Sequence, residues 1–323
     1  MMINVGLVGF GGIAKVHLDN YLLLDNAQVK GVVVNSELSK LKAQTNGLKT
    51  FSSIEELVEN EEIDVIDVLT PTFMHKEHVL KALSLNKNVI VEKPIALNKS
   101  DALEMFNFAK NKNLKLLVAQ VVRFSYESEI LKDICVNNKL GKVLDAYFER
   151  LSSAPKWSTN SWFLDKEKSG HIPFDLHIHD LDLIISIFGN PLSYDVMTCG
   201  RNDLSFKEQY RINYHFEGFD ILATASWYKS FYPFKANWRV VFEDGILEYY
   251  NQELILFKPN MEPVVFQADN DRMVKTDINL PASSMFYKEL KNFISCIEND
   301  EDVPVKQTEV LSTIEILENI LNY

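Results

Sequence analysis

The chain has 323 residues, of which 46% are hydrophobic and 24% charged, which predicts about two globular domains and excludes disordered, fibrous and small disulfide-stapled proteins. Its 33 Lys and Arg residues against 45 Asp and Glu residues give a net charge of −12, which argues against nucleic acids and anionic membranes as partners. Three widely spaced cysteines, no basic leader before the first apolar run and no apolar stretch of about 18 residues together predict a soluble cytoplasmic protein.

Short apolar runs alternate with helical patterns in the first 120 residues. Strands are predicted at residues 3–8, 29–34, 65–69, 89–91 and 114–118, and helices at 13–24, after Ser53, at 76–85 and at 99–112. The apolar runs lack a period of two, so the strands are expected to be buried on both faces. Residues 1–120 are therefore predicted to form a doubly wound parallel sheet.

Residues 121–323 have a different composition, because they contain 30 of the 36 aromatic residues. A helix is predicted at 128–137, a strand at 143–150, an irregular stretch at 152–169 and a helix at 175–188. Strands follow at 194–199, 210–216, 221–227, 238–242, 246–250 and 254–257, and helices at 284–298 and 308–321. This order predicts a second α/β domain on an open, mostly antiparallel sheet.

Glycines cluster where the first predicted strand meets the first predicted helix. The segment from Gly9 to Ala14 matches the dinucleotide-binding pattern G-x-G-x-x-A. Gly9 permits a tight turn, Gly11 allows a pyrophosphate to approach the backbone, and Ala14 keeps helix and strand close. The alternative is a plain turn between a strand and a helix. The residues expected to contact the dinucleotide here are Gly9, Phe10, Gly11, Gly12 and Ile13.

The residues after the second predicted strand do not separate NAD from NADP. An acidic residue at this position contacts the ribose of NAD, and an arginine accommodates the phosphate of NADP. Asn35 and Ser36 stand there instead, and both can form hydrogen bonds with either cofactor. The sequence therefore predicts NAD or NADP, and the alternative is that Asn35 and Ser36 are ordinary turn residues.

Two further motifs have the residue types of a proton-transfer site. Lys93 lies between Glu92 and Pro94 directly after a predicted strand, where the alternative is a surface charge. Asp175 and His179 are four residues apart, so on a helix they share one face, and a carboxylate beside an imidazole suits general acid-base chemistry. The alternatives are a helix cap with a buried histidine and a metal site, and no metal is predicted because the spacing gives no His-x-x-x-His pair.

Taken together, these motifs resemble the Gfo/Idh/MocA family of NAD(P)-dependent oxidoreductases over the whole chain. The motifs are the glycine turn, Thr70-Pro71-Thr72 followed by His75, Glu92-Lys93-Pro94, Arg123-Phe124, and Asp175 with His179 and Asp182. Two departures are a histidine at position 171, where a second glycine is commoner, and the absence of a proline shortly after Arg123.

The resemblance implies a Rossmann domain over residues 1–120 and a substrate-binding, oligomerising α/β domain over 121–323. It implies that Thr70, Pro71, Thr72, His75, Glu92, Lys93 and Arg123 contribute to the cofactor site and that the Lys93-Pro94 bond is cis. It also implies that Lys93, Asp175 and His179 surround the reacting carbon, with sugars, inositols or related polyols as substrates. The second domain's sheet is implied to form homodimers or homotetramers.

The predicted reaction is hydride transfer between a nicotinamide dinucleotide and a secondary alcohol or ketone. His179 is expected to accept the proton, Asp175 to orient it, and Lys93 to stabilise the alkoxide charge. Trp157 and Trp162 are candidates for an apolar wall against the substrate or nicotinamide, with ordinary packing as the alternative. Two rival functions are a non-catalytic dinucleotide-binding regulator or scaffold, and hydrolytic or lyase chemistry that uses the dinucleotide internally.

Overall fold

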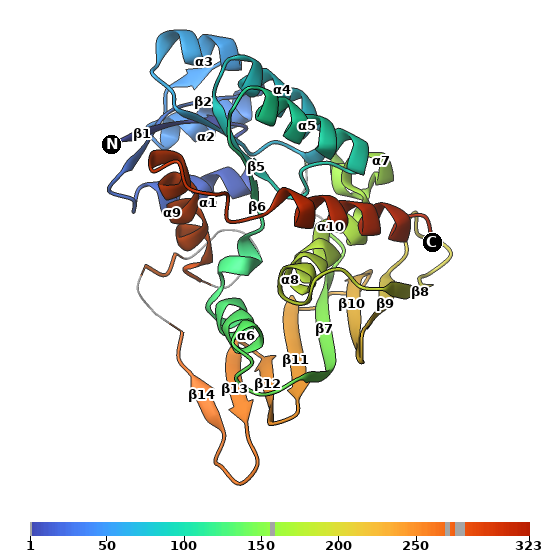
Figure 1. The fold of residues 1–323 in the computed structure, drawn as a ribbon. Helices are drawn as coiled ribbons and strands as arrows, with labels where there is room; N and C mark the ends of the chain where they lie inside the picture. Colours follow the sequence, from blue (N-terminus) through green and yellow to red (C-terminus); the bar gives the residue numbers. More distant parts are fainter. Residues whose placement is uncertain (1, 156–158, 269–271, 275–281) are drawn as a thin grey trace. The chain divides into compact units, whose positions relative to one another are not determined.

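The computed structural model describes residues 2–155, 159–268, 272–274 and 282–323, and the chain divides into two compact units (Figure 1). The first unit holds residues 1–124 and 270–311, and the second holds residues 125–269 and 312–323. In the described part of the chain, no helix combines the length and the apolar character needed to cross a membrane.

The first unit is built on a six-stranded parallel sheet in the order β3-β2-β1-β4-β5-β6. The order reverses between β1 and β4, and doubly wound sheets bind ligands at the carboxyl ends of the strands beside such a reversal. The predicted parallel sheet is therefore confirmed. Its strands are β1 (Ile3–Val8), β2 (Ala27–Val33), β3 (Thr50–Phe51), β4 (Val65–Val68), β5 (Asn88–Glu92) and β6 (Leu116–Ala119).

Helices connect these strands and cover the sheet. Helix α1 packs against α9, which returns from near the end of the chain, and α4 packs against α5 (Figure 1). One apolar cluster joins α1, α9 and the 3₁₀ turn that begins at Val121. Its buried members are Val16 of α1, Val121 of the turn and Phe286 of α9. The helices of this unit are α1 (Gly12–Tyr21), α2 (Glu37–Thr45), α3 (Ile54–Asn60), α4 (His75–Ser84), α5 (Lys99–Asn111) and α9 (Met285–Glu298), with 3₁₀ turns at Thr72–Met74 and Val121–Phe124.

The second unit is built on an eight-stranded sheet in the order β14-β13-β12-β11-β7-β10-β9-β8. Among its described strands, β7 and β10 pair in parallel and the other neighbours pair antiparallel. The predicted mostly antiparallel sheet is therefore confirmed. Its strands are β7 (Val143–Ser153), β8 (Ser193–Cys199), β9 (Gln209–Phe216), β10 (Phe219–Tyr228), β11 (Lys235–Phe242), β12 (Gly245–Tyr250), β13 (Glu253–Phe257) and β14 (Val264–Phe266).

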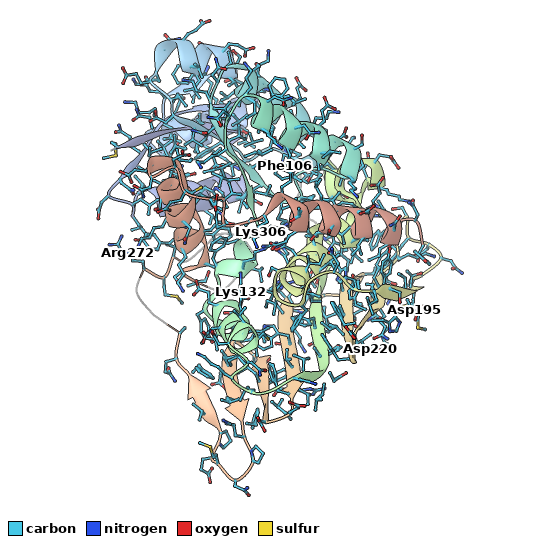
Figure 2. The ribbon with its side chains drawn as sticks, in the orientation of Figure 1. Phe106, Lys132, Asp195, Asp220, Arg272 and Lys306 are labelled. Atoms are coloured by element: carbon cyan, nitrogen blue, oxygen red, sulfur yellow. The ribbon has the colours of Figure 1, made fainter. Side chains whose placement is uncertain are left out.

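The two faces of this sheet differ. Tyr210, Ile212 and Tyr214 of β9 are buried, whereas the alternating Arg211 and His215 lie on the opposite face and keep contact with solvent. Figure 2 labels Asp195 and Asp220, whose carboxylates each lie 3.0 Å from a ring nitrogen of His215. Helices of the remaining segments are α6 (Tyr126–Val136), α7 (Lys166–Ser169), α8 (Ile178–Phe188) and α10 (Gln307–Ile320), with a 3₁₀ turn at Thr159–Leu164 and a π-helical turn at Pro173–His177.

Candidate active site

The turn between β1 and α1 leaves open space beside its glycine backbone. Gly9 has a φ of +91°, and a Cβ there would lie 3.0 Å from the Leu69 carbonyl oxygen, so glycine is required. A Cβ on Gly11 would meet no atom within 4 Å, so the chain itself does not fill that space. Gly12 is also exposed, whereas Phe10 is buried and Ile13 half-buried.

The N-terminus of α1 differs from those of α2, α3 and α5. Helices α2, α3 and α5 follow Ser36, Ser53 and Asn98, whose side chains each accept a hydrogen bond from a backbone N–H of the first turn. Helix α1 follows Gly11, has no side-chain cap and carries no acidic residue in its first turn. Backbone N–H groups and the positive end of the helix dipole therefore favour an anion there. The predicted residues from Gly9 to Ile13 thus fit the pyrophosphate of a nicotinamide dinucleotide.

Asn35 and Ser36, which lie between β2 and α2, have different roles in the fold. Asn35 is exposed and lies two residues after the end of the strand at Val33. The Ser36 side chain caps α2 by accepting a hydrogen bond of 3.1 Å from the Ser39 N–H. Ser36 therefore contributes to helix stability whether or not a cofactor is bound.

His75 joins two of the predicted cofactor segments. It is the first residue of α4 and is 1% exposed, and its Nε2 and Nδ1 atoms lie 2.8 Å from the carbonyl oxygens of Thr70 and Pro94 respectively. Burial lowers the pKa of His75, and the hydrogen bonds to the two carbonyl oxygens oppose this effect. Thr70 and Pro71 stay half-buried, Thr72 is buried, and His75 holds the Thr70 segment against the loop after β5.

Lys93 lies at the carboxyl edge of the parallel sheet, directly after β5. Its side chain is partly exposed, and the Lys93-Pro94 peptide bond is cis, which confirms that expectation. Glu92 Oε2 accepts a hydrogen bond of 2.9 Å from the Lys93 backbone N–H. Glu92 is 8% exposed, so its carboxylate belongs to the interior of the unit.

Three buried polar side chains near this loop were missed by the sequence reasoning. They are His17 and Tyr21 of α1 and Asp67 of β4, and all are at most 1% exposed. Asp67 Oδ2 accepts hydrogen bonds from both of the other side chains. The sequence signal that could have revealed this cluster was Asp67, because it places a carboxylate inside an otherwise apolar buried strand.

Arg123 lies in the 3₁₀ turn after β6. Its guanidinium pairs with Glu309 of α10, and the Arg123 side chain is 7% exposed. Its predicted contribution to the cofactor site stays a prediction.

In the second unit, Asp175 and His179 are the two half-exposed positions of a buried helical segment. Every other residue from Ser169 to Ile185 is buried, including Asp182. Asp175 lies within the π-helical turn, for which Ile172 occupies the capping position, and His179 lies in the first turn of α8. π-Helical turns are frequent at functional sites.

One departure from the family pattern, His171, lies near the start of this segment, next to Gly170. Gly170 has a φ of +67°, and a Cβ there would clash with the Phe174 ring. His171 has a φ of +50°, which is a left-handed conformation that favours glycine. Its ring packs against Phe206 and Trp227, with ring centroids 6.0 and 6.2 Å away.

The other titratable residues of the segment belong to the interior of the unit. His177 is fully buried, and its Nε2 lies 2.6 Å from the Tyr214 hydroxyl oxygen. Burial lowers the pKa of His177 to about 3, and the Arg150 charge adds to that effect. Asp180 accepts a hydrogen bond of 2.8 Å from Arg150 Nη2, and burial raises the pKa of Asp180 although Arg150 opposes this. His177 and Asp180 therefore have structural roles.

Trp162 stacks on Phe163, with ring centroids 4.0 Å apart, and Phe163 packs edge-on against Trp227. Trp162 is half-buried, so part of its surface stays accessible. Trp157 lies outside the described residues. In the described ranges, no group of three or more His, Cys, Asp or Glu residues is arranged to hold a metal ion.

The structure brings several predicted residues together within each unit. In the first unit, Gly9 lies beside Thr70, the Thr70 carbonyl oxygen lies beside His75 Nε2, and His75 Nδ1 lies beside the carbonyl oxygen of Pro94 in the loop that carries Lys93. In the second unit, Asp175 and His179 share the half-exposed positions of one helical segment. These groups can bind an anion, hold a positive charge and exchange a proton.

Comparison with known proteins agrees with these features. Residues 3–120 match the model of an oxidoreductase family with an NAD-binding Rossmann fold, and residues 132–322 match that family's C-terminal alpha/beta domain. Glucose-6-phosphate 3-dehydrogenase of Bacillus subtilis (strain 168) is 32% identical over 193 residues, which are 58% of this chain and 54% of that protein. The 2,7-anhydro-N-acetylneuraminate hydratase of Escherichia coli (strain K12) is 29% identical over 188 residues, which are 58% of this chain and 50% of that protein.

The chain spans about half the length of the curated relatives it matches. A solved structure of a levoglucosan dehydrogenase in complex with NADH and levoglucosan has the same fold, with a TM-score of 0.85 at 17% identity over 100% of this chain and 96% of that chain. Because the two family models cover most of the sequence in chain order, the chain belongs to the Gfo/Idh/MocA oxidoreductase family, with an NAD-binding Rossmann domain and a C-terminal α/β domain.

Proposed function

We propose that the protein is an NAD(P)-dependent dehydrogenase that interconverts a secondary alcohol and a ketone on a sugar, inositol or related polyol. The observation that carries this proposal is the half-exposure of Asp175 and His179 within a segment that is otherwise buried. Two titratable side chains that stay partly exposed in a buried helical segment suit proton exchange with a substrate hydroxyl.

The residues of the first unit fit the cofactor. A bound nicotinamide dinucleotide supplies the hydride acceptor or donor. Gly9, Phe10, Gly11, Gly12 and Ile13 are proposed to hold its phosphates, because the Gly11 backbone is open and the α1 N-terminus has no side-chain cap. Further residues proposed for the cofactor site are Asn35, Ser36, Thr70, Pro71, Thr72, His75, Glu92, Lys93 and Arg123.

Three side chains are proposed to act on the substrate. The His179 imidazole accepts the proton of the substrate hydroxyl in the oxidative direction, and Asp175 orients that ring. The Lys93 ammonium stabilises the negative charge that develops on the substrate oxygen. Trp162 provides an apolar surface against the sugar ring.

The names of the relatives support the proposed substrate class. One relative is named for glucose 6-phosphate, and a structure of the same fold is named for levoglucosan. Carbohydrates and polyols carry the secondary hydroxyls that the proposed reaction needs. The half-buried Asp175 and His179 can form hydrogen bonds with such hydroxyls.

We further propose that the protein acts in the cytoplasm as a homodimer or homotetramer formed through the eight-stranded sheet. The face of this sheet opposite Tyr210, Ile212 and Tyr214 combines charged residues with exposed apolar ones such as Met197 and Leu222, which are 70% and 38% exposed. Light scattering of the purified protein tests this, and a monomer would contradict it.

Net hydration is a second candidate, because relatives at 29% and 31% identity are named 2,7-anhydro-N-acetylneuraminate hydratases. A net hydration that used the dinucleotide only internally would leave its oxidation state unchanged over a turnover, so no reduced cofactor would accumulate. The same acid-base residues serve either chemistry.

A substrate panel distinguishes these functions. The protein is incubated with NAD or NADP and with sugars, sugar phosphates, inositols and anhydrosugars, and the nicotinamide absorbance and the products are followed together. Accumulation of reduced cofactor supports the dehydrogenase. A product without reduced cofactor supports the hydratase. Dinucleotide binding without any product would contradict both and favour a regulator or scaffold.

A further inference from the structure

A buried cluster of charged side chains connects the glycine-turn helix to the loop that carries Lys93. Its members are His17 of α1, Asp67 of β4 and Glu92 of β5, which are 0%, 0% and 8% exposed. The sequence separates His17 from the two carboxylates by 50 and 75 positions. Charged groups are rarely buried unless they are paired, so the cluster requires an explanation.

Both ring nitrogens of His17 face carboxylate oxygens. Nδ1 lies 2.8 Å from Asp67 Oδ2, and Nε2 lies 3.2 Å from Glu92 Oε1. A carboxylate accepts hydrogen bonds, so both nitrogens must donate, and the ring is an imidazolium. Burial alone would lower the pKa of His17, but the Asp67 charge and the hydrogen bonds to Asp67 and Glu92 outweigh it and raise the pKa to about 10.

The second oxygen of Glu92 continues this connection. Oε2 accepts the hydrogen bond of 2.9 Å from the Lys93 backbone N–H. In the same loop, His75 Nδ1 lies 2.8 Å from the carbonyl oxygen of Pro94. The His17 ring therefore reaches the Lys93 backbone through a single carboxylate. The same ring belongs to the helix whose N-terminus is the glycine turn.

We propose that His17 is a positioning residue that fixes the Glu92 carboxylate and, through it, the backbone orientation of Lys93. A neutral or apolar residue at position 17 leaves one oxygen of Glu92 without its charged donor, so the carboxylate is free to turn away from the Lys93 N–H. The inference rests on the proposed role of Lys93 only where turnover is concerned.

A contribution to stability alone is a weak explanation for the buried charged cluster around His17. Replacing buried ion pairs by apolar residues of similar volume is often neutral or stabilising, so their contribution to stability is a weak reason for them. The groups that face the cluster are Tyr21, whose hydroxyl donates to Asp67 Oδ2 at 2.9 Å, and the Phe286 ring of α9, 6.1 Å from the His17 ring. Glu289 of α9 adds a charge near Tyr21.

Tyr21 provides a matched control. Like His17 it is buried, lies on α1 and donates a hydrogen bond to Asp67 Oδ2, whereas the hydrogen bond to Glu92 comes from His17. Tyr21→Phe therefore removes one hydrogen bond to the Asp67 carboxylate. It leaves in place the hydrogen bonds of Glu92 with His17 and with the Lys93 backbone. His17→Gln keeps one donor in a side chain of similar length but loses the positive charge.

The test is amide hydrogen exchange of Lys93, measured by NMR on the dinucleotide-bound protein. We expect the Lys93 amide to exchange at least about tenfold faster in His17→Gln than in the wild type, while amides of β6 keep their rates. Tyr21→Phe should leave the Lys93 amide unchanged. Equal Lys93 exchange in the wild type and His17→Gln would overturn the inference.

If His17→Gln does not fold, Glu92→Gln provides a second test of the inference. It keeps the shape of the side chain but removes the charge that His17 pairs with, and it should also accelerate Lys93 exchange, whereas unchanged exchange would overturn the inference. With an active substrate in hand, His17→Gln should lower kcat by about 10²-fold with little change in dinucleotide affinity, and Tyr21→Phe should not. If the wild type turns over no substrate, the proposed function fails, but the exchange rates still decide the role of His17.

Discussion

Asp175 and His179 occupy the two half-exposed positions between Ser169 and Ile185, one in the π-helical turn and the other in the first turn of α8. Their titratable neighbours His177 and Asp180 are buried, and each has a protein partner. The segment therefore contains one buried histidine and aspartate, His177 and Asp180, and two partly exposed residues, Asp175 and His179. The proposed proton transfer uses the two partly exposed residues, Asp175 and His179.

Gly11→Val should abolish dinucleotide binding while the protein stays folded. The Gly11 backbone has a φ of −100° and a ψ of −162°, which other residues adopt, and a Cβ there meets no protein atom. A valine would instead fill the space proposed for the pyrophosphate. Calorimetric titration measures the affinity and thermal unfolding checks the fold, and equal affinity in both proteins would contradict the proposed site.

Asn35→Asp should move cofactor preference toward NAD by about 1–2 kcal/mol, because a carboxylate accepts from the ribose hydroxyls and repels the phosphate of NADP. Asn35 is exposed between β2 and α2, and its substitution should not disturb the fold. The ratio of kcat/KM for NAD and NADP measures the change. An unchanged ratio would show that Asn35 does not face the adenosine ribose.

The stability of the first unit should depend on pH through His17. The pKa of His17 is about 10 in the folded protein against an ordinary 6.5, so the folded state binds the additional proton between these values. The stabilisation is complete below about pH 6.5 and is lost as the pH rises toward about 10. Urea denaturation at pH 7, 8 and 9 should show a steeper loss for the wild type than for His17→Gln, and parallel losses would contradict this protonation state.

Asp180→Asn should destabilise the protein by about 3–5 kcal/mol, because it leaves the buried Arg150 charge without its partner. The double variant Arg150→Met with Asp180→Leu should recover most of that loss. Asp195→Asn is the control, since its ion pair with His215 is exposed and its removal should leave the free energy of unfolding nearly unchanged. Equal effects of Asp180→Asn and Asp195→Asn would contradict a structural Arg150–Asp180 pair.

Periodicity and turn chemistry made much of the fold predictable. Strand β1 begins and ends where the apolar run does, at Ile3 and Val8, and the glycine turn follows it. No element was predicted between residues 35 and 52, where α2 and β3 lie. In α2, Ala43 is the one buried residue, so no apolar stripe marks the helix.

Long-range relationships were not predictable from the sequence. The parallel pairing of β7 with β10 joins strands that two other strands separate in the chain, and neither strand's pattern specifies its neighbour. The contacts of His17 with Asp67 and Glu92 likewise depend on three elements meeting in one sheet-and-helix layer. The motif at Asp175 and His179 predicted candidate residues, but their half-exposure appeared only in the structure.

The most direct test of the proposed chemistry compares turnover with thermal stability for His179→Ala, Asp175→Asn and Lys93→Met. His179→Ala should lower turnover by about 10²–10⁴-fold and leave the dinucleotide affinity nearly intact, as expected for loss of a positioned acid-base group. Asp175→Asn should lower turnover less, because it keeps the shape of the side chain, and Lys93→Met should be severe because it removes the charge beside the developing alkoxide. All three variants should melt close to the wild type, and a stable, fully active His179→Ala would contradict the account.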